Sequence, residues 1–409
     1  LAAIPNVHLV GTSSDTTIGI SAAATVGTAD EMTVALSSAA TSSSANLTAQ
    51  GIETFNVVAS VASGSAAFSQ TLTSSTASSV VITGDASTNI TVDLAGAGAT
   101  ADLTGSVTGN AAANTMSVTA DVTDFMSIDL KGGNDVLFLA NGIGANYTVA
   151  GGEGVNVLSL SQANATAANA AATLSGFQVL NVATAGTGII DMDDFEGGFT
   201  KVIYDAGLGG ATTVDDAVTG TIVEVDVTAV AQNLTVDLKT DGAADAITVE
   251  LDDIGAGDAI GTIDASDAET LTISVDDDTT TATGTIAIAG VTLGDATSVV
   301  LSGDAATTIT TFTNPTTAVL TSFDASSMTD NLTMSGLNLA AAGGTIKVGS
   351  GDDTVTMGTG NGADTVDLAA GGDNTIVYTA LAQSDAAGMD VIKGFVSGSD
   401  SIDLTGMAL

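Results

Sequence analysis

Apolar and polar residues alternate with a period of two along most of the chain. Val223, Val225 and Val227, for example, alternate with Glu224 and Asp226. Such runs are about 5–6 residues long, rich in Thr, Val and Ile, and bounded by Gly, Asp, Ser or Asn, which is the pattern of short half-buried strands separated by turns. The pattern recurs at 234–238, 247–251 and 271–275. The chain is therefore predicted to be almost entirely β-structure.

One stretch departs from this alternation. Ser161 to Leu174, SQANATAANAAATL, consists mainly of Ala and small polar residues. It lacks large apolar residues at helical spacing, so it predicts only a short helix or a loop that leaves the regular strands.

Internal repeats indicate how the strands are arranged. SSVVITGDASTNIT at 78–91 nearly repeats as TSVVLSGDAATTIT at 297–310. A second set consists of IETFNV at 52–57, FQVLNV at 177–182 and AETLTI at 268–273. Short β units repeated many times favour an all-β, right-handed parallel β-solenoid, in which each coil stacks on its neighbours. A string of β-sandwiches is the competing architecture.

Three imperfect copies of the nonapeptide G-G-x-G-x-D-x-U-x, where U is a large aliphatic residue, lie between Lys347 and Val377. This repeat is typical of calcium-binding β-rolls. Its glycines allow tight turns that aim carbonyl oxygens at a hard cation, and its Asp or Asn adds a side-chain oxygen. The predicted calcium positions are Gly349, Gly351, Asp353, Gly360, Gly362, Asp364, Gly372 and Asn374.

A second block of the same kind lies between Leu130 and Ser159. Asp135 and Asn156 are 21 residues apart, the separation that also joins Asp353 to Asn374. Each pair is predicted to span one full coil, and the earlier block lacks the middle motif. The block adds Gly133, Asn134, Asp135, Gly152, Gly154 and Asn156 to the calcium positions. The chain is accordingly divided into segments 1–160 and 161–409, each ending in a calcium roll.

Two further acids, Asp85 and Asp304, occur in the repeated [ST]-G-D-A turn. Stacked turns could share an ion through these carboxylates, or each Asp could cap its own backbone as an Asx-turn. Asp252, Asp253 and the run Asp276 to Asp278 are instead expected to be exposed acids.

The charge excludes several classes of partner. The 409 residues include 47 Asp and Glu but only five basic residues, all lysine, for a formal net charge of −42. Nucleic-acid binding and attraction to anionic membranes both need cationic groups, so neither is expected. The hydrophobic fraction of 44% still predicts a folded chain, with bound cations balancing the acids.

Cysteine and long apolar runs are both missing from the sequence. Without cysteine there is no disulfide framework and no thiolate metal site. No run of about 18 apolar residues predicts a membrane-spanning helix. The chain opens on Leu1 without a signal peptide, so it is expected to be a piece of a longer secreted chain.

Thr297 to Met334, followed by the nonapeptides, resembles the C-terminal region of α-proteobacterial surface-layer proteins with repeats-in-toxin motifs. Asp390 to Leu404, DVIKGFVSGSDSIDL, resembles the strand that ends many such calcium rolls, which adds Asp390 and Asp400 to the metal positions. The nonapeptides and this closing segment cover roughly a sixth of the chain, and looser repeats cover most of the rest.

The resemblance implies a secreted structural protein that self-assembles on the bacterial cell surface and needs several calcium ions to fold. It also implies export through a C-terminal type I secretion signal that is missing here. Attachment to cell-surface polysaccharide would use a region outside this sequence. The first alternative is a calcium-dependent adhesin or biofilm-matrix stalk, which shares the same repeats.

A β-helix polysaccharide lyase or hydrolase is the less favoured alternative. Paired carboxylates could serve such an enzyme, and the candidates are Asp193, Asp194 and Glu196, or Asp276, Asp277 and Asp278. There is no arginine or tryptophan, and the single histidine, His8, is expected to be structural. The sequence therefore predicts a protein that is not an enzyme.

Overall fold

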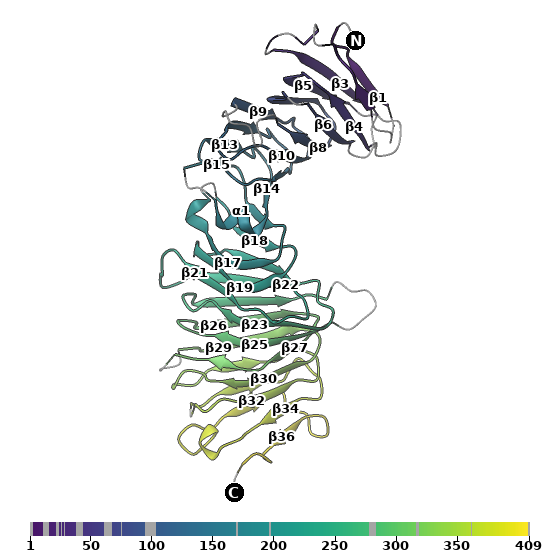
Figure 1. The fold of residues 1–409 in the computed structure, drawn as a ribbon. Helices are drawn as coiled ribbons and strands as arrows, with labels where there is room; N and C mark the ends of the chain where they lie inside the picture. The colour runs from purple at the N-terminus through teal and green to yellow at the C-terminus, as the bar shows by residue number, and fades with distance from the viewer. Residues whose placement is uncertain are drawn as a thin grey trace. The chain divides into compact units, whose positions relative to one another are not determined.

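The structure is a computed structural model, shown in Figure 1. It divides into two compact units: unit 1 comprises 1–183 and 193–199, and unit 2 comprises 184–192 and 200–409. The predicted boundary between residues 160 and 161 falls inside unit 1, and as a domain boundary it stays a prediction. The described residues are 3–10, 16–21, 24–25, 27, 29–37, 44–60, 68–74, 76–94, 104–168, 171–195, 198–277, 284–315, 319–360 and 362–407.

Unit 1 contains two sheets whose strands alternate along the chain, so that each coil contributes one strand to each sheet. Sheet 1A has the order β1 (Val7–Val10), β3 (Glu31–Ser37), β5 (Thr54–Ala59), β7 (Ser79–Gly84), β9 (Thr104–Thr108), β11 (Phe125–Asp129), β13 (Tyr147–Ala150) and β15 (Thr173–Ser175). Sheet 1B has the order β2 (Thr16–Ile18), β4 (Ser44–Ala49), β6 (Phe68–Thr73), β8 (Thr88–Asp93), β10 (Asn114–Thr119), β12 (Val136–Leu139), β14 (Val157–Leu160) and β16 (Val179–Val182).

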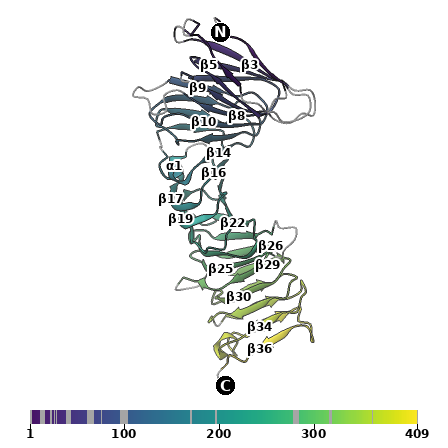
Figure 2. The ribbon, with the colours of Figure 1, turned by 45° about the vertical axis from the view of Figure 1, so that its right-hand side comes forward.

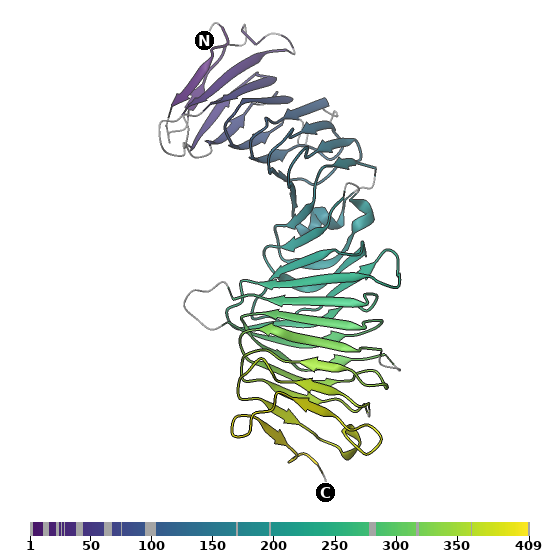
Figure 3. The ribbon, with the colours of Figure 1, turned by 180° about the vertical axis from the view of Figure 1, so that it is seen from behind.

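Unit 2 repeats this plan, and its stacked strands are seen from behind in Figure 3. Sheet 2A has the order β17 (Gly186–Asp191), β19 (Leu208–Ala217), β21 (Leu234–Leu238), β23 (Ala256–Asp264), β25 (Thr285–Thr292), β27 (Ala306–Ile309), β30 (Leu332–Leu337), β32 (Thr354–Met357), β34 (Thr375–Val377) and β36 (Ser401–Asp403), and β28 (Phe312–Thr313) also pairs with β25. Sheet 2B has the order β18 (Lys201–Tyr204), β20 (Ile222–Asp226), β22 (Ala246–Asp252), β24 (Thr270–Val275), β26 (Ser298–Gly303), β29 (Ser322–Met328), β31 (Thr345–Lys347), β33 (Thr365–Asp367) and β35 (Val391–Lys393).

The apolar half of each alternating run lies inside the coils. In β22, Val249 and Leu251 are completely buried, and Val249 is aligned with the buried Ile273 of β24 in the next coil. Apolar residues of one coil therefore stack on apolar residues of the next along each sheet, and adjacent coils bury each other's side chains.

All the strand ladders among the described residues are parallel, which a string of antiparallel sandwiches would not produce. The predicted all-β parallel solenoid is confirmed.

The interruption at 161–174 contains one short helix, α1 (Gln162–Thr166), which lies against β14 (Figure 2). Ser161 caps it by accepting a hydrogen bond from the backbone N–H of Asn164. The helix ends after five residues because no apolar stripe continues it, as the sequence predicted. Two 3₁₀ turns, η1 (Met192–Asp194) and η2 (Leu381–Gln383), complete the elements.

Both copies of the repeated [ST]-G-D-A turn leave one sheet for the other. The first lies between β7 and β8 and the second between β26 and β27. Their glycines, Gly84 and Gly303, have φ of 95° and 132°, and a Cβ on either would overlap the backbone of the preceding coil. The repeat therefore encodes a turn that lets two coils approach closely.

Candidate functional site

The position at the start of a strand, either its first residue or the one just before it, forms a column of polar side chains along the stacked coils. In unit 1 the column before sheet 1B contains Asn114, Asp135, Asn156 and Gln178. The backbone N–H of Asn114 donates to Oδ1 of Asp135 at 2.7 Å, and that of Asp135 donates to Oδ1 of Asn156 at 2.8 Å. The 21-residue separation therefore joins adjacent coils, as predicted.

Unit 2 has two such columns in its C-terminal coils. Before sheet 2A, the backbone N–H groups of Leu332, Asp353 and Asn374 donate to Oδ1 of the residue one coil later, at 2.8, 3.0 and 2.9 Å. Those acceptors are Asp353, Asn374 and Asp400. The nonapeptide Asp and Asn positions are thus adjacent in space.

The second column lies before sheet 2B. The backbone N–H of Gly344 donates to Oδ1 of Asp364 at 3.0 Å, and that of Asp364 donates to Oδ1 of Asp390 at 2.9 Å. The middle nonapeptide therefore belongs to the opposite corner of the same coil, which is why its acid lies between Asp353 and Asn374 in sequence but not in space.

The nonapeptide glycines allow the turns of adjacent coils to approach. Gly154 and Gly372 have φ of 110° and 82°, and a Cβ on either would overlap the carbonyl oxygen of Gly133 or Gly351. Gly360 differs, because the nearest atom to its Cβ would be 3.7 Å away. The remaining predicted glycines are Gly349, Gly152 and Gly362, and a Cβ on each would come within 3 Å of the preceding coil's backbone. Asn361 lies outside the described residues.

Two of the carboxylates hold an oxygen that no hydrogen bond satisfies. Asp135 is 0% exposed and Asp353 is 1% exposed, and in each only Oδ1 accepts a bond, so Oδ2 is buried without a partner. Burial raises the pKa of both groups to about 6. Burial raises the pKa of Asp364 to about 6 as well. A buried carboxylate is costly in its charged form unless a cation lies beside it, so these positions favour a bound cation.

These residues fit calcium. The ion prefers carboxylate and carbonyl oxygens, and the buried Oδ2 atoms lie in Gly-rich turns whose coils approach closely enough to bring backbone of adjacent turns together. Asp135, Asp353 and Asp364 would supply the charged ligands.

The closing segment contributes acids that are already hydrogen-bonded. Oδ2 of Asp390 accepts from the hydroxyl of Tyr378 at 2.9 Å, and Oδ2 of Asp400 accepts from the backbone N–H of Val396 at 2.6 Å. Both acids end their columns, and their role as metal ligands stays a prediction.

Asp85 and Asp304 lie away from these columns, in the turns that follow β7 and β26. Oδ1 of Asp304 accepts from the backbone N–H of Asp277 in the preceding coil at 2.8 Å, and Asp85 is exposed. The structure does not bring either residue to the nonapeptide turns, and an ion shared by such turns stays a prediction.

An acidic cluster outside the nonapeptides was not predicted. Carboxylate oxygens of Glu224, Asp226 and Asp252 lie within 4.8 Å of one another. Burial, together with Asp205 and the other neighbouring acids, raises the pKa of Asp226 to about 6. The alternation of Val with Glu and Asp in β20 carried the signal, because parallel stacking brings the polar positions of adjacent strands together.

Two ion pairs involve Glu224 of this cluster and its neighbour Glu250. Lys201 contacts both Glu224 and Glu250, the latter at 2.7 Å. Asp252, expected to be exposed, is half-buried, whereas Asp253 is exposed.

Two glutamates that sequence reasoning passed over belong to the same kind of column. The backbone N–H of Asp30 donates to Oε2 of Glu53 at 2.9 Å, and that of Asp245 donates to Oε2 of Glu269 at 2.7 Å. Gln178 occupies the equivalent place in FQVLNV. The Glu or Gln at the second position of this repeat therefore encodes the hydrogen bond.

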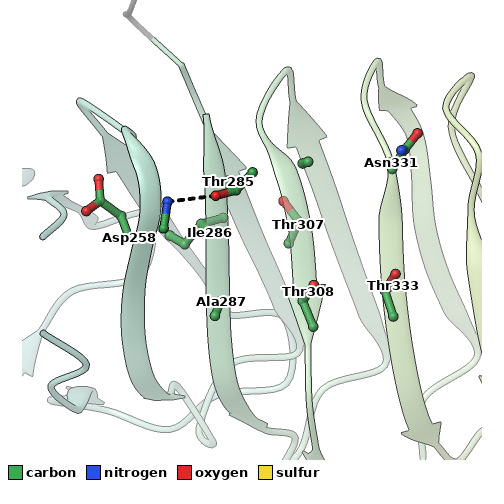
Figure 4. Close-up of a pocket in the computed structure, with 10 residues that line it drawn as sticks. Asp258, Thr285, Ile286, Ala287, Thr307, Thr308, Asn331 and Thr333 are labelled. Atoms are coloured by element: carbon green, nitrogen blue, oxygen red, sulfur yellow. Dashed lines mark hydrogen bonds between the residues drawn. The ribbon is translucent and has the colours of Figure 1, made fainter. Parts of the chain in front are cut away.

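An open groove of about 290 Å³ crosses the outer face of sheet 2A (Figure 4). Thr285, Thr308 and Thr333 line it. The hydroxyl of Thr285 accepts from the backbone N–H of Gly257 at 2.7 Å, and Asp258 accepts from the N–H of Gly255 at 2.7 Å. These polar groups serve local turns and supply no set of catalytic groups.

Replacing Asn156 with Leu is expected to destabilise unit 1 by about 1–3 kcal/mol, because the buried backbone N–H of Asp135 would lose its acceptor. Urea unfolding followed by circular dichroism measures the loss. Asn146→Leu is the matched control, since Asn146 is exposed and should change stability by no more than about 0.5 kcal/mol. Equal losses in the two variants would contradict the role given to the column.

In calcium-free solution, unit 1 is expected to lose stability as the pH rises from about 4 to about 7. The pKa of Asp135 is about 6 in the folded protein and about 3.9 in an unfolded chain. The contribution present below about pH 4 is therefore lost as the pH passes the folded pKa, by about 2–3 kcal/mol. Urea unfolding at several pH values measures it, and Asp135→Asn should remove this component. An unchanged pH dependence in that variant would exclude Asp135 as the cause.

Comparison with known proteins supports the assignment at the C-terminus. Residues 308–409, about a quarter of the chain, match the family model described as Peptidase M10 serralysin C terminal. No curated protein matches the chain. The matched part contains all three C-terminal nonapeptides and the closing segment, so it is similar to a repeats-in-toxin calcium roll.

Proposed function

We propose that this protein is a secreted, calcium-binding structural protein that self-assembles into a layer on the bacterial cell surface. The observation that carries the proposal is the unsatisfied Oδ2 of Asp135 and of Asp353, each buried in a column of stacked Gly-rich turns. Calcium would neutralise these carboxylates and couple ion binding to folding.

The acidic surface supports assembly through ions. With a net charge of −42, two copies repel each other unless cations lie between them. Half-buried clusters such as Glu224, Asp226 and Asp252 offer oxygens for bridging ions. Anchoring to cell-surface polysaccharide, through a region outside this chain, is part of the same proposal.

The last coil supports an association surface. Ile392 and Ile402 align with Val366 and Ile376, which are fully buried in the coil before. In the last coil, the side chain of Ile402 is 45% exposed, because no further coil among the described residues covers it. The large apolar side chains exposed in this region are Leu381, Met389, Val391, Phe395, Val396, Ile402 and Leu404. Exposed large apolar side chains, where they gather into a patch, mark interaction sites.

The candidate catalytic acids do not favour an enzyme. Asp193 and Asp194 are neighbours in the single turn η1, so they do not face each other across a cleft. Asp276 accepts from the hydroxyl of Ser274, and Asp277 accepts from the N–H of Gly284, which are turn contacts. Glu196 and Asp278 lie outside the described residues.

No helix in the described part of the chain is long and apolar enough to cross a membrane.

A calcium titration starting from chelator tests the proposal. Circular dichroism follows folding, and light scattering with electron microscopy follows assembly into ordered sheets. Magnesium at equal ionic strength is the control, because it screens charge but binds such flexible oxygen sites poorly. Folding without assembly would favour an adhesin stalk. Ordered sheets formed in chelator, or equally well in magnesium, would contradict a calcium-dependent layer.

A further inference from the structure

The two corners of the C-terminal coils are joined differently. At the Asp353 corner, which leads into sheet 2A, adjacent coils exchange two hydrogen bonds in opposite directions. The backbone N–H of Asp353 donates to Oδ1 of Asn374 at 3.0 Å, and the backbone N–H of Asp373 donates back to Oδ1 of Asp352 at 2.8 Å. We call this pair of opposed bonds a reciprocal clasp.

The clasp recurs at two further pairs of coils among the described residues, where an Asn of the earlier coil accepts the returning bond. It is not formed between the last two coils, where the N–H of Ser399 donates to the carbonyl oxygen of Val396. One coil earlier, Oδ1 of Asp353 accepts from Leu332 and Oδ1 of Asn331 accepts from the N–H of Asp352 at 2.7 Å. In unit 1, Oδ1 of Asn134 accepts from the N–H of Val155 at 3.0 Å, opposite the bond from Asp135 to Asn156. Recurrence in both units makes it a property of the sequence motif.

The Asp364 corner, which leads into sheet 2B, lacks the returning bond. Asp364 and Asp390 accept from the coil before, but the positions that would accept the returning bond are Gly343 and Ala363. Neither residue has a side-chain hydrogen-bond acceptor. The corner is also built from a longer segment, 378–390, between β34 and β35. Ordering this corner therefore costs more conformational entropy than ordering the Asp353 corner. Fewer hydrogen bonds between coils offset that cost.

We propose that calcium folds these two corners in a fixed order. The reciprocal clasp holds the Asp353 corner in register before calcium binds, and the Asp364 corner closes only when calcium arrives. The inference rests on the proposed calcium binding and adds its sequence of events. The chain would then respond to calcium in two steps, with the Asp353 corner already in register in the coils that the clasp joins.

Hydrogen exchange on the full chain tests this order. In chelator, amides 353–357 and 374–377 should be protected about tenfold more than amides 364–367 and 390–393, as one additional charge-assisted bond predicts. Calcium should then increase protection more at the second set. Equal protection of the two corners in chelator would overturn the proposal.

Three variants isolate the clasp. Asp352→Ala removes the acceptor and should lower protection at 353–357 and 374–377 in chelator to that of the Asp364 corner, with recovery in calcium. Asp352→Asn keeps the acceptor and should behave like the wild type. Ala363→Asn places an acceptor at the equivalent position of the other corner, where residue 363 is exposed, and should raise protection at 364–367 and 390–393.

The outcomes separate this inference from the proposed function. A difference between corners in chelator that calcium does not change would overturn calcium binding itself. A calcium response that is equal at both corners, with Ala363→Asn having no effect in chelator, would leave calcium binding intact and overturn the order of folding.

Discussion

Asp353→Asn is expected to stabilise the C-terminal coils in chelator and to destabilise them in calcium. Asp353 is 1% exposed, and burial raises its pKa to about 6. Keeping the carboxylate ionised at pH 7 therefore costs about 2–3 kcal/mol relative to the unfolded chain. Asparagine keeps Oδ1 as the acceptor for the N–H of Leu332 but carries no charge. In chelator the variant should gain about 2 kcal/mol.

In calcium the sign reverses, because asparagine removes the anionic oxygen left free at Oδ2. An ion present at about 100 times its dissociation constant contributes roughly 2.7 kcal/mol to the folded state. The variant should lose most of that contribution. Local stability is best measured by hydrogen exchange of the β32 and β34 amides, since a repeat protein of this length need not unfold in one step.

Asp352→Asn provides the matched control for this reversal. Asp352 is exposed and its Oδ1 accepts from the N–H of Asp373, a bond that asparagine can also accept. Its substitution should leave local stability nearly unchanged in both solutions. If Asp353→Asn shifted stability in the same direction with and without calcium, the free carboxylate oxygen would not be the calcium ligand.

Gly372→Ala is expected to destabilise the same coils by about 3–5 kcal/mol, whether or not calcium is present. The residue has φ of 82°, and its Cβ would overlap the carbonyl oxygen of Gly351 in the preceding coil. Because that neighbour is backbone, the two coils must separate or shift. Urea unfolding in chelator and in calcium measures the loss.

A substitution at the neighbouring Gly371 distinguishes the two causes of this loss, which are the positive φ and the overlap of the Cβ with the preceding coil. Gly371 has φ of 119°, but a Cβ there has nothing within 4 Å. Gly371→Ala should therefore show only the conformational cost of about 1–2 kcal/mol. Equal losses at 371 and 372 would mean that the close approach of the coils is not what requires glycine at position 372.

The sequence was sufficient to predict the coils because their signal is local and repeated. Alternating runs such as 247–251 became strands with one face buried, and the 21-residue separation of Asp135 and Asn156 correctly gave adjacent coils. The middle nonapeptide was placed within one coil, yet its position at the opposite corner required the strand pairing.

The contacts that could not be predicted from the sequence join coils that contain different numbers of residues. Glu53 and Glu269 bond to residues 23 and 24 positions earlier, whereas Asp390 bonds to a residue 26 positions earlier. No single period finds all of these partners. The cluster of Glu224, Asp226 and Asp252 was missed for the same reason, since strand register decides which outward acids meet.

The parallel ladders also determine how the coils would resist tension. Backbone hydrogen bonds in both sheets point along the direction in which coils stack, so a pull in that direction loads successive coil interfaces in series. The interface with the fewest bonds then sets the strength of the unit. Pairs such as β33–β35 and β34–β36 align only three residues each, whereas β23–β25 aligns seven. The C-terminal coils would part first under load, and ions bound across their turns would act there as cross-links.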